Sequence, residues 1–498
     1  MKAIDIAVTN KFYRDDFMLR YEGLPISAFV RGYIHNDGLK WMCDRRWIGD
    51  KVSIIGGTDE NINRLLKYSN NSLVEFTLYC NPESLSDFAL SWNEDDDLSS
   101  PSIISNLKKY CPNLQRLQLD HEEIRGGDLR DLFEVVTQLK SFSFSGNISE
   151  EDIFIMMANF KDLQSLYVRP SDEEKLSDSI ITATIRNCPY LKSLRIDEWN
   201  LTDESFIALG NSALVLESFK FHSHTCHISE DAKVLFFSQQ SSLTNIDLSC
   251  SSGFTHPGVI ELIAPLISQV LELNLSYNEI HETTILTIAF NCPLLEKLDL
   301  SNNLRAFSDF KLTALGKHCP HLTDVNLGCS RGLADSTLMS LAIFGNLQYL
   351  NMRGCEITDK SIFILVRRCL KLKKLQLGYC RHITQAALIL IYGNCEHLTE
   401  LYIDDCREIH LSENFKNSIE LGRKQSGKKN IKCYHDDLEA EQSQSLNNYL
   451  FELNAWEQEL EELIADLGAA DEENDDSIIE AEDSENDNDD DDDGDDNE

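Results

Sequence analysis

An apolar motif of the form L-x-x-L-x-L, in which other apolar residues can replace leucine, recurs through most of the 498-residue chain. Between Leu114 and Leu398 it occurs twelve times at a mean spacing of about 26 residues, and an earlier copy begins at Leu73. The twelve copies begin at Leu114, Leu139, Leu163, Leu191, Leu216, Leu243, Val270, Leu295, Leu322, Leu347, Leu372 and Leu398.

A period in the twenties built on this motif is typical of a leucine-rich repeat, in which each copy supplies one short strand followed by a helical segment. One repeat cannot bury its own apolar face, so neighbouring repeats stack into a continuous core. We therefore predict the α/β class, as a leucine-rich repeat solenoid over residues 61–435 with about 13 repeats. It should form a horseshoe with parallel strands inside and helices outside, with an acidic insertion near residues 83–101.

Twelve of the 15 cysteines fall at two fixed places in the repeat. One group lies three residues before the first strand leucine, and the other lies two or three residues after the last one. The first group is Cys111, Cys188, Cys292, Cys319, Cys369 and Cys395, and the second is Cys80, Cys250, Cys329, Cys355, Cys380 and Cys406. Metal ligands must converge on one point, whereas these residues recur once per repeat. We therefore interpret them as small buried apolar residues in a reducing compartment, and we predict no metal site.

Two stretches, NCPYLKSLRIDEWNLTDESFIALG and HCPHLTDVNLGCSRGLADSTLMSLA, resemble the cysteine-containing subtype of leucine-rich repeat. That subtype is similar to the substrate-binding half of F-box/leucine-rich-repeat proteins, which are receptors in SCF-type ubiquitin ligases. The resemblance covers roughly residues 61–435 and implies that the chain brings a protein substrate to a ligase without performing chemistry itself.

Residues 1–60 would have to hold the F-box that this resemblance implies. Leu24 and Pro25 resemble its opening, and the segment from Cys43 to Trp47 resembles its later helix, although the gap between them is short. We keep two interpretations of residues 1–60. They are a degenerate F-box that docks the ligase through Leu24, Pro25 and Trp47, or an N-terminal cap over the first repeat.

Residues that alternate with the strand leucines should project from the concave face, because side chains alternate along a strand. Tyr and Arg on such a rigid surface are frequent anchors of protein interfaces. The residues that alternate with the strand leucines include Asp197, His222 and Asp404. We predict the partner-binding residues to be Arg116, Tyr167, Arg169, Arg195, Lys220, Asp247, Tyr349, Arg353, Lys374 and Tyr402.

The formal net charge of −39 is concentrated at the C-terminus. Residues 436–498 hold 28 acidic residues and no Lys or Arg, so a chain of this sign is not expected to bind nucleic acid or an anionic membrane. The sequence has no apolar run long enough to cross a membrane, and the charges near its start lead us to expect no signal peptide. We expect a cytoplasmic or nuclear protein.

Residues 444–468 carry leucines seven apart, beginning at Leu446, and are predicted to form an amphipathic helix that docks in cis or on a partner. Residues 469–498 are almost purely acidic and are predicted to be a disordered tail. Such a tail can bind basic proteins such as histones.

Motifs of known catalytic or phosphate-binding sites are missing from the sequence, and its one histidine cluster, at 222–227, lacks a second group of ligands. We therefore predict a non-enzyme without a cofactor, which binds a protein partner on its concave face. The main hypothesis is a substrate-receptor subunit of an SCF-type ligase that contacts the ligase subunits. The alternative is an acidic-tailed nuclear scaffold that binds histones or other basic proteins.

Overall fold

The structure is a computed structural model. It describes residues 51–55, 63, 66–67, 74–79, 100–170, 176–197, 200–223, 228–255, 257–303, 309–330, 333, 335–336, 345–409 and 431–434. The chain divides into two compact units, Met1–Gly332 and Leu333–Glu498, and each unit is described by itself.

The described part of the first unit contains eleven strands, and every neighbouring pair is parallel and follows the chain order. The strands are β1 (Lys51–Ile55), β2 (Glu75–Tyr79), β3 (Arg116–Arg125), β4 (Ser141–Asn147), β5 (Ser165–Pro170), β6 (Ser193–Asp197), β7 (Ser218–His222), β8 (Asn245–Asp247), β9 (Glu272–Asn274), β10 (Lys297–Asp299) and β11 (Asp324–Asn326).

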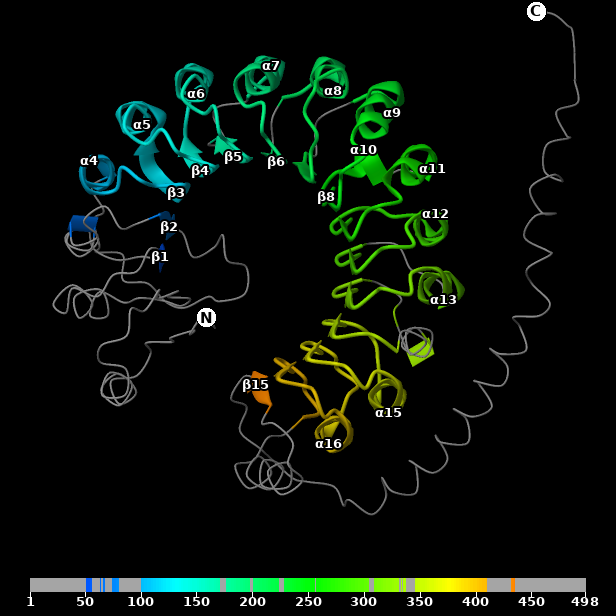
Figure 1. Cartoon of the computed structure of the whole chain (residues 1–498). Coiled ribbons are helices and arrows are strands. Elements are labelled where there is room, and N and C mark those ends of the chain that lie inside the picture. Colours follow the sequence, from blue (N-terminus) through cyan, green and yellow to red (C-terminus); the bar gives the residue numbers. More distant parts are fainter. Residues whose placement is uncertain are drawn as a thin grey trace, which may run out of the picture. The chain divides into compact units, whose positions relative to one another are not determined.

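Helices connect these strands and lie along one side of the sheet (Figure 1). They are α4 (Ser100–Tyr110), α5 (Gly126–Phe133), α6 (Glu150–Met157), α7 (Asp178–Asn187), α8 (Asp203–Gly210), α9 (Glu230–Gln239), α10 (Ser252–Thr255), α11 (Pro257–Ile263), the 3-10 helix η2 (Ala264–Ile267), α12 (Glu282–Asn291) and α13 (Asp309–His318).

The second unit repeats the same plan with four parallel strands among its described residues. They are β12 (Tyr349–Asn351), β13 (Lys374–Gln376), β14 (Glu400–Tyr402) and β15 (Lys432–Tyr434), and the helices are α15 (Asp359–Arg368) and α16 (Gln385–Asn394). These alternating strands and helices form the predicted α/β leucine-rich repeat solenoid, and the prediction of the fold class is confirmed.

The core lies between the sheet and the helices, because the motif residues are the ones that face it. From Leu114 to Ile403, every residue at the three motif positions is at most 3% exposed. On β7, for example, Phe219 and Phe221 are buried while Lys220 and His222 lie on the opposite face. We call that opposite face, which carries the residues between the buried ones, the open face of the sheet.

The sheet begins earlier than the sequence motif does. Strand β1 lies within residues 1–60 and pairs in register with β2, before the predicted start of the solenoid at residue 61. The motif misses this repeat because Gly49 stands where the first leucine would be, three residues before Val52.

Several predicted segments lie outside the described residues. They are residues 1–50, with Leu24, Pro25 and Trp47, the predicted helix at 444–468 and the acidic segment at 469–498. Residues 83–99 of the acidic insertion are also outside, while its last two positions belong to α4.

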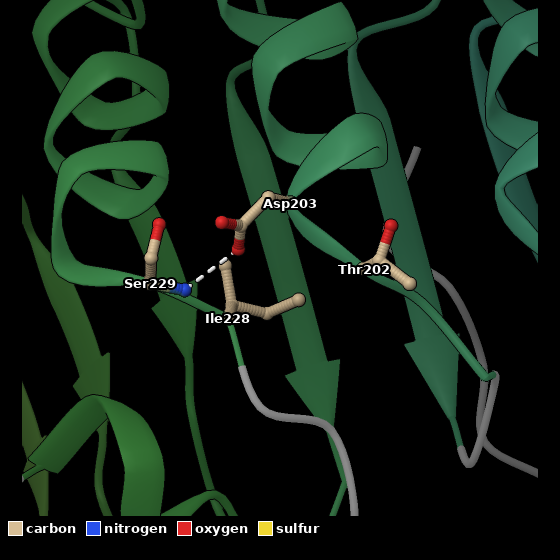
Figure 2. A pocket seen from close by; sticks show the side chains of 4 residues that line it. All are labelled: Thr202, Asp203, Ile228 and Ser229. Carbon is tan, nitrogen blue, oxygen red and sulfur yellow. Dashed lines mark hydrogen bonds between the residues drawn. The ribbon is translucent and has the colours of Figure 1, made fainter.

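Aspartates at the start of several helices tie each repeat to the next. The Asp178 carboxylate, at the start of α7, accepts hydrogen bonds from the Thr202 backbone N–H at 2.9 Å and from the Thr202 hydroxyl at 2.8 Å. Figure 2 shows the equivalent bond one repeat later, where Asp203 accepts from the Ser229 backbone N–H at 2.7 Å. Asp359 binds Thr384 in the same way in the second unit. These bonds satisfy backbone donors that a helix start leaves without an intrahelical partner.

The turn after each strand has a fixed conformation from β8 onward. The second residue after the last buried motif residue has a positive φ, as at Cys250, Tyr277, Cys329 and Tyr379. The third residue is buried and bonds to a backbone carbonyl. The Ser251 hydroxyl donates to Phe221 at 2.8 Å, for example, and the Cys380 thiol to Met352 at 3.1 Å.

This turn corrects the prediction that all twelve repeat cysteines are buried. Cys355, Cys380 and Cys406 occupy the third position and are buried, as are the six cysteines before the strands. Cys250 and Cys329 occupy the second position, so they are half-buried and exposed, respectively, and Ser251 and Ser330 fill the buried place instead. Cys80 lies outside the described residues.

Candidate functional site

Nine of the ten predicted partner-binding residues lie on the parallel strands, and the tenth lies in the turn after one. In the first unit Arg116 lies on β3, Tyr167 and Arg169 on β5, Arg195 on β6, Lys220 on β7 and Asp247 on β8. In the second unit Tyr349, Lys374 and Tyr402 lie on β12, β13 and β14, and Arg353 follows β12. None is fully buried, and whether they bind a partner stays a prediction.

Tyr167, Arg195 and Asp197 form one connected group across β5 and β6. The Tyr167 hydroxyl donates to Asp197 at 2.8 Å, and the Arg195 guanidinium donates to the same carboxylate at 2.8–3.1 Å. The guanidinium also lies 4.2 Å from the centre of the Tyr167 ring. The Tyr and Arg side chains are therefore already held in fixed positions. Binding a partner would then cost less side-chain conformational entropy.

His222 links this group to the next strand. Its Nδ1 lies 3.1 Å from Asp197, and its Nε2 lies 3.1 Å from Asp247 on β8. Lys220 lies 3.8 Å from the other oxygen of Asp247. The two carboxylates are largely covered, with side chains 6% and 15% exposed. We call Asp197, His222 and Asp247 the carboxylate–imidazole bridge.

The charges in the bridge stabilise one another. Burial alone would lower the pKa of His222, but its bonds to Asp197 and Asp247 outweigh burial and raise the pKa to about 9. Burial alone would raise the pKa of Asp247, but the bond from His222 lowers it to about 2. Burial opposes ionisation of Asp197 too, yet hydrogen bonds from His222 and Arg195 hold its pKa well below the usual range. At neutral pH the bridge is an imidazolium between two carboxylates.

Ser249 gives this site a superficial likeness to a nucleophile–base–acid triad. Its hydroxyl lies 3.0 Å from His222 Nε2, and His222 Nδ1 faces Asp197. A triad needs a neutral imidazole that accepts the serine proton. Here the imidazole is protonated, and the Ser249 hydroxyl donates to Asp247 at 2.8 Å. In this protonation state Ser249, His222 and Asp247 hold one another in place on the open face.

Arg116 and Arg169 stand apart from these contacts. Arg116 pairs with Glu75 of β2 at 3.1 Å and its side chain is 60% exposed. Strand β4, which separates Arg116 from β5, presents only serines on the open face between its buried phenylalanines. Arg169 is exposed at the end of β5.

A second group in the other unit centres on Lys374. Its ammonium lies 5.4 Å from the Tyr349 ring centre, 4.9 Å from that of Tyr402, and 3.7 Å from Glu400. The Tyr402 ring stacks on Tyr434 of β15 at 4.3 Å. Burial, followed by the Glu400 charge, raises the pKa of the Tyr402 hydroxyl, which therefore remains a neutral hydrogen-bonding group.

Arg353, in the same unit, makes one ion pair and one contact with an aromatic ring. It pairs with Asp404 at 2.6 Å, and its guanidinium lies 4.4 Å from the centre of the Tyr379 ring. Tyr379 is 43% exposed and was not among the predicted residues. It sits in the turn and not on the strand, at the positive-φ position, so the strand alternation gives no signal for it.

The described residues contain neither a candidate metal-binding group nor a candidate membrane span. Within them, no group of three or more His, Cys, Asp or Glu side chains could hold a metal ion. No helix in the described ranges is long and apolar enough to span a membrane.

Comparisons with known proteins agree with the repeat architecture. Residues 346–363 match a family model described as a Leucine Rich repeat. The DNA repair protein rhp7 of Schizosaccharomyces pombe is 26% identical over 250 residues, which are 49% of this chain and 43% of that protein. Antagonist of mitotic exit network protein 1 of Candida glabrata is 28% identical over 120 residues, 23% of each chain. The chain thus spans less than half the length of these relatives.

Among solved structures, a chain of the Rad7 and Elc1 complex in yeast is 15% identical with a TM-score of 0.45, covering 75% of this chain and 84% of that one. A leucine-rich repeat protein of Leptospira interrogans is 18% identical with a TM-score of 0.38, covering 78% and 89%. The parallel strands, the period and the matched repeat together identify the fold of this chain as a leucine-rich repeat fold.

Proposed function

We propose that the chain is a non-catalytic recognition scaffold that binds a protein on the open face of its sheet. The observation that carries this proposal is the ordered open face itself. Tyr167 and Arg195 are fixed by Asp197, and Tyr349 and Tyr402 flank Lys374. Rigid Tyr and Arg side chains are the residue types most enriched among interface anchors.

The finer proposal is that the chain is the substrate-receptor subunit of an SCF-type ubiquitin ligase. It rests on the resemblance of the repeats to the cysteine-containing subtype of F-box/leucine-rich-repeat proteins. In this proposal the open face takes the substrate, while Leu24, Pro25 and Trp47 contact the ligase. The similarity to proteins named for DNA repair and for antagonism of mitotic exit is compatible with action in the nucleus or cytoplasm.

Affinity capture with the full chain and two kinds of variant tests this proposal. Replacing Leu24, Pro25 and Trp47 together by Ala should remove the SCF subunits from the eluate but keep the substrate protein. Arg169→Ala and Tyr349→Ala should do the reverse, each lowering substrate recovery by about tenfold if it is an anchor. Tyr190→Ala is the matched control, because Tyr190 is 63% exposed in a turn before β6 and away from the open face.

SCF subunits missing from the eluate of the unaltered chain would contradict the receptor proposal. If histones are recovered instead, and are lost when the aspartates of 487–496 are changed to Asn, the acidic-tailed scaffold is the better description. Equal loss of substrate in Arg169→Ala, Tyr349→Ala and Tyr190→Ala would show that the open face is not the binding surface.

A further inference from the structure

The open face of β5–β7 exposes mainly positive charge, although the whole chain is strongly acidic. The acids there, Asp197 and Asp247, are 6% and 15% exposed in their side chains and already accept several bonds. The bases Arg195 and Lys220 are 37% and 42% exposed. Arg169 is exposed beside them, and the neighbouring β4 adds only serines. We call Arg169, Arg195 and Lys220 the basic patch.

The open face of β9–β11 has the opposite balance. Glu272, Asp299 and Asp324 lie there with one lysine, Lys297, which is 51% exposed and pairs with Glu272 at 2.5 Å. Lys297 therefore lies in an acidic part of the open face, whereas Lys220, which pairs with the largely covered Asp247, lies directly beside Arg195 of β6. An acidic ligand would be attracted to β5–β7 and repelled from β9–β11.

The chain itself carries a ligand of this chemistry. Residues 436–498 contain 28 acidic residues and no Lys or Arg. Sixty-three residues reach up to about 200 Å when extended. A tethered segment of this kind has an effective concentration of about a millimolar, far above that of a typical free partner.

We infer that the acidic segment 436–498 binds the basic patch of its own chain and competes there with other ligands. This inference deepens the proposed function and rests on it, because it describes how the open face would be regulated. A partner that uses the basic patch must then displace the acidic segment, so such a partner needs either clustered negative charge of its own or further contacts elsewhere on the face.

Zero-length carbodiimide cross-linking of the full chain, read by mass spectrometry, tests this inference. The reagent joins a lysine amine to a carboxylate only when the two are in contact. We expect Lys220 to be joined to acids within 436–498. Lys297 should be joined to Glu272, which provides an internal standard, and only weakly to the acidic segment.

Two matched charge reversals test whether the cross-link depends on the charge of the basic patch. Arg169→Glu should lower the yield of the Lys220 cross-link to 436–498 by about fivefold, because it removes one exposed ion pair of ordinary strength and adds a repulsion of similar size. Arg186→Glu makes the same charge change on an exposed residue of α7, on the helical side, and should leave the yield unchanged. Raising the salt to about 0.5 M should also suppress the cross-link, because exposed charges are then screened within a few ångströms.

Three results would overturn the inference. Lys220 could be joined only to Asp247 or to the acids at 172–174, or Lys220 and Lys297 could be joined equally to the acidic segment. In a mixture of isotopically light and heavy chains, the link could also prove to be only between molecules. These outcomes can be distinguished from a failure of the proposed function. Recovery of SCF subunits without the cross-link removes this inference alone, and the cross-link without SCF subunits removes the receptor proposal alone.

Discussion

At the residue scale, the most consequential feature is the carboxylate–imidazole bridge. Asp197 and Asp247 lie on strands two apart, and His222 lies on the strand between them with one ring nitrogen toward each. A buried carboxylate is costly unless it is paired and hydrogen-bonded. In the bridge, the His222 imidazolium pairs with both carboxylates. It thereby couples three successive repeats through their side chains.

The bridge should make stability depend on pH in a defined direction. The folded pKa of His222, about 9, is above its ordinary value of 6.5. A raised pKa means that the folded state binds the proton more tightly, so this stabilisation is complete below pH 6.5 and is lost as the pH rises through 9. The free energy of unfolding should fall across this window, by at most about 3 kcal/mol from this group.

Urea unfolding of the unaltered chain and of His222→Gln at several pH values measures this effect. The variant lacks the titrating ring and should lose this part of the slope between pH 6.5 and 9. His321→Gln, which changes an exposed histidine in the turn before β11, serves as the control. Parallel pH profiles for the unaltered chain and His222→Gln would show that the bridge does not stabilise the fold.

At the scale of the element, the repeats are joined at both ends of the helix–strand unit. The turn after the strand is fixed by a positive-φ residue and a buried side chain that bonds to a backbone carbonyl. The start of the helix is fixed by aspartates that accept from the next repeat, as Asp178 does from Thr202. These bonds are polar contacts made between repeats, so they add to the stacking of the apolar core.

Removing one of these aspartates should weaken the contact between two repeats. Asp178→Ala leaves the Thr202 backbone N–H without its acceptor and also removes the bond from the Ser205 hydroxyl. The free energy of unfolding should fall by about 1–2 kcal/mol, as for other lost helix caps.

The measurement is again urea unfolding, with Asp162→Ala as the matched control. Asp162 is exposed in the turn before β5, and its removal should change the free energy by less than about 0.5 kcal/mol. If the two variants lose the same stability, the bonds between repeats at the helix starts contribute little.

At the scale of the whole molecule, the repeat architecture limits how far a perturbation spreads. Each repeat contacts its neighbours, so local damage should be felt mainly within one or two repeats. Strands β5–β7 belong to the first unit and β12–β14 to the second, several repeats apart along the chain.

Leu375→Ala should reveal this limit. Leu375 is fully buried on β13, and its truncation should cost about 3 kcal/mol through lost burial and the cavity left behind. Hydrogen exchange should accelerate in β12, β13 and β14, while β5–β7 of the first unit stay protected as before.

The reciprocal variant Leu194→Ala, on β6, should accelerate exchange around β5–β7 and leave β12–β14 unchanged. Acceleration of all strands by either variant would mean that the two units unfold as one cooperative body.

The repeat fold follows from the periodic motif alone, because a leucine at each motif position must be buried and stacked parallel strands bury all of them. Nine of the ten predicted binding residues lie on strands, since alternation along a strand is a local property, and Arg353 lies in the turn after β12. The sequence pattern missed β1, where Gly49 breaks the motif, and it misjudged Cys250 and Cys329, which are one residue out of step with Cys380.

The pairing of the open-face residues, in contrast, depends on how the repeats stack in three dimensions. Asp197 and His222 are visible in the sequence as polar strand residues, but they lie 25 positions apart and meet only because β6 and β7 pair in register. Tyr379 meets Arg353 through a turn conformation that strand alternation does not describe. Which carboxylates are covered and which bases remain exposed therefore depends on contacts between repeats, and no single repeat contains that information.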